Sequence, residues 1–156
     1  MKSEIIPYNL IRKLAPGVAN RQTVMDYLGK PKVISYGNDF KVIYKYPNEG
    51  VEVVIRIGEK ATCSIVKTIV ISSPLKNPTS EILDVGMSFN KAKSICNAHY
   101  ELELDTDNSR IYSLGDPKLN LQIWKKQGKL EKIEFFQWFD KNCITSYQLT
   151  ADKFYI

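Results

Sequence analysis

The sequence contains few of the residues on which catalytic and metal sites depend. Its 156 residues include one histidine, His99, and three cysteines, Cys63, Cys96 and Cys143. The cysteines are widely spaced and odd in number, which matches neither a disulfide framework nor a paired-cysteine zinc site. We expect all three thiols to be free, as in a reducing cytoplasm; one disulfide with a spare thiol is the alternative. No metal and no other cofactor are expected.

Long apolar runs and runs of positive charge are also missing. No segment approaches the roughly 18 apolar residues that a membrane-spanning helix needs. The N-terminal residues MKSEIIP contain no apolar core of a signal peptide. These absences predict a cytoplasmic protein, or a periplasmic one if a signal sequence was removed. The apolar fraction of 44% and the charged fraction of 25% are those of an ordinary globular protein.

The net charge of +5 is concentrated in the first half of the chain. Residues 1–72 carry 11 Lys and Arg against 6 Asp and Glu, whereas residues 73–156 carry 11 of each kind. An acidic partner would therefore be expected to meet the first half. A charge of this size is also explained by solubility alone, and no Lys- and Arg-rich tail typical of nucleic-acid binding is present.

The first half predicts a helix followed by four strands. The helix, residues 20–28, can begin at the capping side chain of Asn20 and end at Gly29. Four runs rich in Val, Ile and Tyr follow, separated by the turn-forming segments GND, PNEG and GEKATC. These predicted strands span 32–36, 40–46, 51–57 and 65–72.

The second half repeats this order after the proline-containing segment SSPLKNPTS. A helix is predicted over 88–96, with Ser88 as its cap. Four β-like runs follow at 100–105, 110–114, 119–125 and 129–139. Short helices at 9–14 and 79–83 are expected before the two units.

One offset relates the two halves. A shift of 68 residues aligns Val24 with Ala92 in the helices and Val53 with Leu121 in the strands. At the last strand the shift becomes 64, which places Ile69 on Ile133 and Ile71 on Phe135. We therefore predict an α+β fold of two tandem α–β4 repeats, residues 1–73 and 74–156, with antiparallel meander sheets and helices on one face. The repeats form one compact unit.

Alternation along the last two strands predicts a face that carries aromatic and charged side chains away from the helices. Aromatic residues with flanking charges are typical of protein-binding hot spots. The alternative is that the tail 143–149 or the other sheet covers these residues as a second core. The candidate partner-binding residues are Trp124, Lys132, Glu134, Phe136 and Trp138, with Arg56 on the same face of the first half.

Two groupings were candidates for catalysis or metal binding, and neither predicts an enzyme. Cys96 and His99 could supply a nucleophile and a base, but Cys96 falls on the core face of its helix and no third group is evident. Four acids, Glu101, Glu103, Asp105 and Asp107, alternate along a predicted edge strand and turn. No glycine-centred calcium loop follows them, so they are interpreted as a solvated strand that discourages edge pairing.

A nucleic-acid-binding module is a further alternative. Lysines surround the hairpin that contains Trp124, and basic residues beside an aromatic ring are typical of base stacking. Three acids interrupt this patch, which disfavours nucleic acid as the partner. The lysines are Lys125, Lys126, Lys129 and Lys132, and the acids are Glu131, Glu134 and Asp140.

The segments APGVANRQTVMDYLGKP and LDVGMSFNKAKSIC resemble the Gly–(Met)–Ser/Thr–helix–Gly start of the outer-membrane lipoprotein family SmpA/OmlA. They are equally similar to the tandem-repeat β-lactamase inhibitor protein, which shares the α–β4 unit. Gly17 lies one residue further from its helix than in that pattern, and Asn97 stands where the second closing Gly is expected.

Both resemblances imply a protein that binds other proteins through the concave face of its sheets, without catalysis. A cytoplasmic immunity or inhibitor protein, which covers the active site of a toxin or an enzyme domain, would suit this scaffold. A cell-envelope assembly factor of the SmpA/OmlA type is the alternative.

Overall fold

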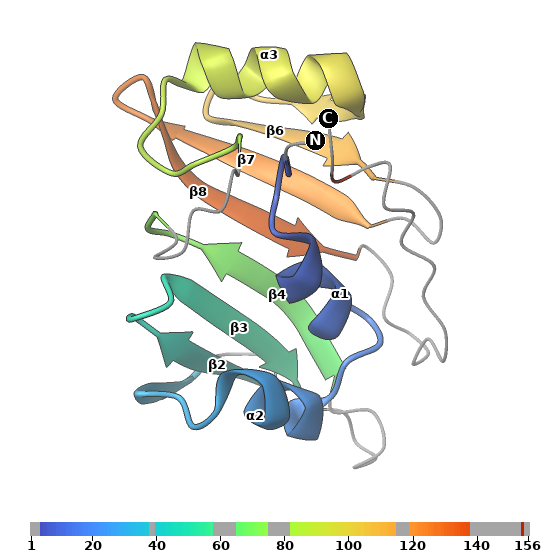
Figure 1. Cartoon of the computed structure of the whole chain (residues 1–156), viewed down its shortest axis with the longest axis vertical. Coiled ribbons are helices and arrows are strands. Elements are labelled where there is room, and N and C mark those ends of the chain that lie inside the picture. Colours follow the sequence, from blue (N-terminus) through green and yellow to red (C-terminus); the bar gives the residue numbers. More distant parts are fainter. Residues whose placement is uncertain are drawn as a thin grey trace.

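The structure is a computed structural model that describes residues 4–37, 40–57, 65–74, 82–114, 119–137 and 154. Within these residues, eight strands form one sheet, and each neighbouring pair is antiparallel. The strand order is β1-β2-β3-β4-β8-β7-β6-β5. The helices α1, α2 and α3 lie over one face of the sheet (Figure 1). The predicted α+β class is confirmed.

The strand bounds follow the alternation in the sequence closely. The first seven strands begin and end within one residue of the predicted runs, while β8 ends at Phe136 and its predicted end at 139 lies outside the described residues. The strands are β1 (Val33–Tyr36), β2 (Lys41–Tyr46), β3 (Val51–Arg56), β4 (Ile65–Ile71), β5 (Glu101–Asp105), β6 (Ser109–Ser113), β7 (Asn120–Lys126) and β8 (Lys129–Phe136).

The helix α2 (Arg21–Leu28) begins and ends as its sequence predicts. The Asn20 side-chain oxygen accepts a hydrogen bond from the Thr23 amide at 3.0 Å, which satisfies one of the free N–H groups of the first turn. Gly29 follows with a φ of 78°, a conformation that glycine adopts without a steric cost. Val24 is fully buried beneath the helix.

The helix α3 (Phe89–His99) extends three residues beyond its predicted end, and Ser88 occupies the N-cap position as predicted. The Ser88 side chain makes no capping hydrogen bond. Instead, the Phe89 amide donates to the Gly128 carbonyl at 3.0 Å, so the turn between β7 and β8 satisfies the start of the helix. The buried side of α3 consists of Phe89, Ala92 and Cys96.

The helix α1 (Tyr8–Lys13) confirms the short helix expected before the first unit. The Glu4 carboxylate accepts a hydrogen bond from the Tyr8 amide at 2.8 Å. Most of the counterpart expected at 79–83 lies outside the described residues, and Ile82 and Leu83 bond to the backbone of Glu4 and Ile5 without helical structure. None of the described helices is long and apolar enough to span a membrane.

The two halves of the sheet meet where β4 pairs with β8. In this seam, Ile69 is opposite Phe135 and Ile71 is opposite Ile133, and all four side chains are buried on the helix side. The same register places Val70 opposite Glu134 on the other face. The predicted repeats 1–73 and 74–156 are not tested by this topology alone and stay a prediction.

The core lies between the sheet and the helices, and it includes two fully buried tyrosines, Tyr44 on β2 and Tyr112 on β6. The Arg21 Nε donates to the Tyr44 hydroxyl at 3.0 Å, and the Tyr112 hydroxyl donates to the Asn97 Oδ1 at 2.8 Å. Each ring is therefore buried while its polar tip reaches a partner near a helix, as buried tyrosines require. Phe154 is also fully buried, and its ring meets that of Tyr8 at 4.9 Å.

Cys96 is a free, fully buried thiol, as expected; Cys63 and Cys143 lie outside the described residues. Burial raises the pKa of the Cys96 thiol from 9.0 to about 12. The pKa of Tyr46 is raised from 10.0 to about 12, chiefly by burial and further by Tyr44 and Glu49. Burial also raises the pKa of Tyr100.

These shifts predict a loss of stability in alkali. Above pH 9 the unfolded chain releases these protons while the folded chain retains them, so the free energy of unfolding should fall as the pH rises from about 9 toward 12. Urea unfolding at a series of pH values measures the effect. In the Cys96→Ala variant, the free energy of unfolding should fall less steeply with pH near pH 9–10. A midpoint that stays constant from pH 8 to 11 would contradict this prediction.

Candidate functional site

The sheet face opposite the helices, here called the open face, carries a mixture of charged, polar and apolar side chains. Buried and half-buried residues alternate along β2, β3 and β8, and the half-buried ones belong to this face. No described helix lies over it (Figure 1). Its central residues are Ile43, Lys45, Glu52, Val54, Thr68, Val70, Asn120, Gln122, Trp124, Lys132, Glu134 and Phe136.

Trp124 and Lys132 form a cation–π contact on the open face. They are opposite each other on β7 and β8, and the Lys132 ammonium lies 4.7 Å from the centre of the Trp124 ring. A cation at this distance is attracted by the negative face of the indole. The Lys132 ammonium also meets a Glu134 carboxylate oxygen at 3.3 Å, so one lysine joins the ring to the acid.

The contact of Trp124, Lys132 and Glu134, here called the polar centre, is continued toward β6 by further polar side chains. Glu134 is opposite Gln122 on β7, and the Gln122 amide donates to the Ser109 hydroxyl at 3.0 Å. The Ser109 and Thr106 hydroxyls are 3.0 Å apart in turn. The side chain of Glu134 is only 19% exposed and that of Lys132 34%, so their ion pair is partly shielded from water. A shielded pair is less screened by salt than a surface pair.

The same row of side chains crosses the seam into the first half. Glu52 is opposite Val70, and Val70 is opposite Glu134. Glu52 is also opposite Lys45, and their charged atoms are 3.9 Å apart. Each half therefore contributes one lysine–glutamate pair to the open face, with Val70 between them.

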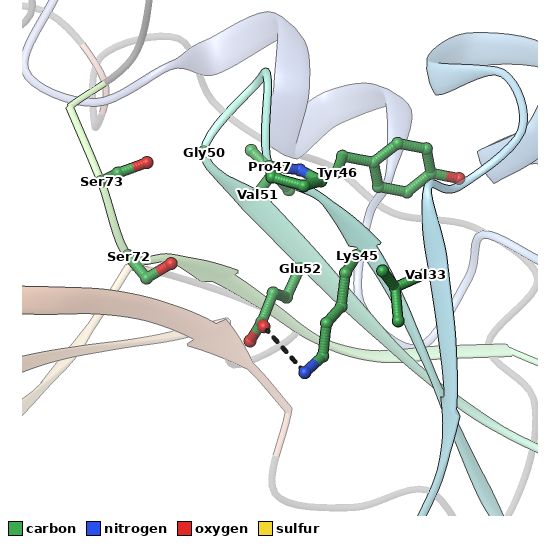
Figure 2. A pocket seen from close by; sticks show the side chains of 9 residues that line it. All are labelled: Val33, Lys45, Tyr46, Pro47, Gly50, Val51, Glu52, Ser72 and Ser73. Carbon is green, nitrogen blue, oxygen red and sulfur yellow. Dashed lines mark ion pairs between the residues drawn. The ribbon is translucent and has the colours of Figure 1, made fainter.

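A pocket of about 220 Å³ lies at the end of this row in the first half (Figure 2). Figure 2 shows the Lys45 and Glu52 side chains meeting on one side of it, with Val33 of β1 beside them. Gly50 forms part of the wall with a φ of 69°, and a Cβ there would lie 2.4 Å from the Ser73 hydroxyl. Only glycine fits this position. The lining residues are Val33, Lys45, Tyr46, Pro47, Gly50, Val51, Glu52, Ser72 and Ser73.

Among the residues that the structure describes, three side chains on or beside β7 and β8 hold buried polar atoms that have no hydrogen-bond partner there. They are both amide atoms of Asn120, the Trp124 Nε1 and the Gln137 Oε1. Asn120 is fully buried on the open face, opposite Phe136. A buried amide without a hydrogen-bond partner lowers the free energy of unfolding. Such groups are expected at functional sites, where residues are retained for binding and not for stability.

The structure brings together four of the six predicted site residues. Trp124, Lys132, Glu134 and Phe136 share the open face on β7 and β8, and all four are half-buried. Trp138 lies outside the described residues, as does the tail 143–149 that would cover the face. Arg56 does not join this group. It is at the far end of β3, on the order of 20 Å from Trp124 by strand spacing.

The hydrogen bonds that link Gln122, Ser109 and Thr106 and the pocket beside Lys45 were not predicted from the sequence. The alternation in the β2 and β3 sequences is consistent with Lys45 and Glu52 sharing one face, and it could have been used to pair them. The hydroxyl contacts follow from the turn at 106–109, where the Ser109 amide donates to the Thr106 hydroxyl at 3.1 Å. The sequence predicts a turn after β5, but it does not specify that the Ser109 and Thr106 hydroxyls bond each other or that Ser109 accepts a hydrogen bond from Gln122.

The alternative catalytic and metal sites gain no geometric support. Cys96 is fully buried with a raised pKa, so it is not poised as a thiolate nucleophile. The acids of β5 are exposed, and Asp105 accepts two hydrogen bonds from Arg110 at 3.0 and 3.1 Å. Within the part of the chain that the structure describes, no group of His, Cys, Asp and Glu side chains could hold a metal ion.

The lysines near the Trp124 hairpin mostly face partners within the chain. The Lys126 ammonium meets Glu131 at 3.9 Å, and the Lys125 ammonium lies 5.8 Å from the Phe89 ring centre. Lys132 is held by Trp124 and Glu134. This arrangement is less typical of a phosphate-binding patch, in which lysines are aimed at the ligand.

No family model matches the chain, and no curated protein matches it. Among solved structures, an extracellular protein containing a SCP domain from Bacillus anthracis strain Ames is similar, with a TM-score of 0.46 and 10% identity. The match covers 78% of this chain and 44% of that one. A likeness at this level carries no argument about the function of this chain.

The unpaired amide of Asn120 gives a test of the open face. We expect Asn120→Leu, which keeps the approximate shape and removes both unpaired atoms, to raise the free energy of unfolding by about 1 kcal/mol. Gln122→Leu is the matched control on the same strand and should not stabilise, because it removes the hydrogen bond to Ser109. Urea unfolding compares them, and a clear destabilisation by Asn120→Leu would show that Asn120 has a partner.

Proposed function

We propose that this chain is a non-catalytic protein that binds another protein through the open face. It acts as an immunity or inhibitor protein in the cytoplasm and covers the active site of a toxin or an enzyme domain. The observation that carries the proposal is the contact of Trp124, Lys132 and Glu134 on a face over which no described helix lies.

The physical properties of this centre are those of a protein-binding hot spot. A half-buried tryptophan already ordered by a lysine loses little side-chain entropy when a partner contacts it. The adjacent Lys132–Glu134 pair presents both charge signs in a fixed arrangement, which selects among partners and sets their register. The Lys45–Glu52 pair extends the same pattern across the seam.

The proposal includes two tandem α–β4 repeats, and the strand registers support them. Tyr44 is opposite Val53 in the first half, and Tyr112 is opposite Leu121, with 68 residues between each corresponding position. Both tyrosines are fully buried. A common offset in two separate strand pairs is expected if the halves are copies of one unit. Because the common offset supports a repeated unit, the proposal includes the resemblance to the SmpA/OmlA family and the β-lactamase inhibitor protein.

The register corrects one part of the predicted alignment. Val53 is opposite Ile69, and Leu121, its counterpart, is opposite Phe135. The offset at the last strand is therefore 66 rather than 64, so Ile69 corresponds to Phe135 and not to Ile133. Side chains alternate with a period of two, so a shift of two residues leaves the burial pattern unchanged and the sequence pattern could not separate the two offsets.

A charge swap tests the proposed binding centre without changing the net charge. The double variant Lys132→Glu with Glu134→Lys keeps an ion pair but reverses its direction on the open face. If the product of the adjacent open reading frame is the cognate toxin, we expect the swap to weaken binding at least about thirtyfold. Trp124→Ala should have a similar effect. Calorimetry measures the affinity, and growth of cells that express both proteins measures protection.

The chain offers a matched control on the same hairpin. Lys126→Glu with Glu131→Lys swaps a more exposed pair outside the centre and should change the affinity less than about threefold. The urea midpoint confirms that each variant folds. Normal binding and protection by a folded central swap would overturn the proposal. Binding to nucleic acid that falls steeply with salt would favour the alternative class.

A further inference from the structure

The two edges of the sheet differ in how they resist pairing with another strand. At β5, Glu101, Glu103 and Asp105 alternate with Leu102 and Leu104, and the register shifts between the two leucines. Charged side chains and a bulge are common devices that keep an edge strand from pairing with other chains. The edge at β5 is therefore protected.

The edge at β1 lacks both devices. Its four residues, Val33, Ile34, Ser35 and Tyr36, contain no charge, and their register with β2 runs without a shift. Ile34 is 45% exposed and Tyr36 82% exposed. Phe40, just before β2, is 80% exposed. An uncharged edge strand with exposed apolar side chains can pair with a further strand.

The hydrogen-bond pattern identifies which backbone groups are available. The Gly37 amide donates to the Lys41 carbonyl at 2.9 Å, so this pair belongs to the hydrogen-bonded set of the ladder. Because hydrogen-bonded and non-hydrogen-bonded pairs alternate, the N–H and C=O groups of Ile34 and Tyr36 point away from β2. The same two residues carry the exposed apolar side chains.

The charges around this edge select the kind of strand that it would accept. Between Tyr27 and Lys41 the chain contains three lysines, Lys30, Lys32 and Lys41, and one acid, Asp39. Lys30 and Lys32 are exposed and directly precede β1. An acidic segment is attracted to this charge, whereas a second copy of β1 would bring two sets of lysines together.

We propose that β1 is a docking edge for an extended, acidic segment of a partner protein, which adds to the sheet as a further strand beside β1. Alternate apolar side chains of that segment pack on Ile34 and Tyr36, its backbone bonds to theirs, and its acids meet Lys30 and Lys32. This surface is separate from the open face, because it uses the edge of the sheet and not its polar centre.

A synthetic peptide tests the edge directly. In the probe, alternating valines and threonines are flanked by pairs of glutamates; one control peptide has lysines in place of the glutamates, and another has a central proline. We expect the glutamate peptide to bind saturably to the isotope-labelled protein and to slow amide exchange at Ile34 and Tyr36. Both control peptides should bind at least about tenfold more weakly.

Variants of the protein separate backbone pairing from charge. Ile34→Pro removes an outward N–H without removing a bond to β2, and it should weaken peptide binding at least about tenfold. Lys30→Glu with Lys32→Glu should reverse the preference, so that the lysine peptide binds better. The matched control, Lys91→Glu with Lys93→Glu on α3, has the same net charge and should leave the preference unchanged. Trp124→Ala should not alter peptide binding, which distinguishes this site from the open face.

Several results would overturn the proposal. These are an absence of binding, unchanged affinity in a folded Ile34→Pro variant, unchanged preference after reversal at Lys30 and Lys32, or protection of other amides by the peptide. Concentration-dependent association that protects Ile34 and Tyr36 without peptide would instead identify a second copy as the occupant. If Ile34→Pro does not fold, the charge reversal decides the question alone.

Discussion

The antiparallel pairing of β4 with β8 is the constraint on which the rest of the structure depends. Each of these strands is the last of its four-stranded meander, and their pairing makes one sheet from two. The buried rows Ile69–Phe135 and Ile71–Ile133 join the two parts of the core beneath the helices. On the other face, the same pairing places Val70 between Glu52 and Glu134. The open face is continuous only because this seam is formed.

The seam also determines where the sheet ends. With β4 and β8 at the centre, β1 and β5 become the two edges, about seven strand spacings apart. One edge carries alternating acids and a bulge, and the other carries exposed apolar residues beside lysines. The sheet thus has three chemically different surfaces: a buried helix side, an open face with paired charges and one unprotected edge. The open face and the β1 edge are the surfaces on which binding is proposed.

The local elements could be predicted from the sequence because each depends on neighbours in the chain. The alternation of Val, Ile and Tyr with polar residues specified the strands, and Asn20 with Gly29 specified the ends of α2. The same parity correctly separated buried Ile133 and Phe135 from half-buried Lys132 and Glu134. These features need only a period of two or a capping side chain.

The features that depend on distant partners could not be predicted in this way. Alternation does not specify which strand pairs with β4, and it leaves a two-residue ambiguity in the offset of β8 from β4. The cap at Ser88 was predicted from residue type, but a carbonyl from the hairpin at Gly128, forty residues later, satisfies the start of α3 instead. The stacking of Lys132 on Trp124 likewise requires the register of β7 with β8.

Native-state amide hydrogen exchange tests the central role of the seam most directly. If β4 and β8 join the two meanders into one cooperative unit, the bonded amides at 68–71 and 133–136 should exchange only through global unfolding. Their opening free energy should then equal that of the most protected amides in β3 and β7. Seam amides that exchange well before both meanders, or two meanders that open with separate free energies, would contradict the account.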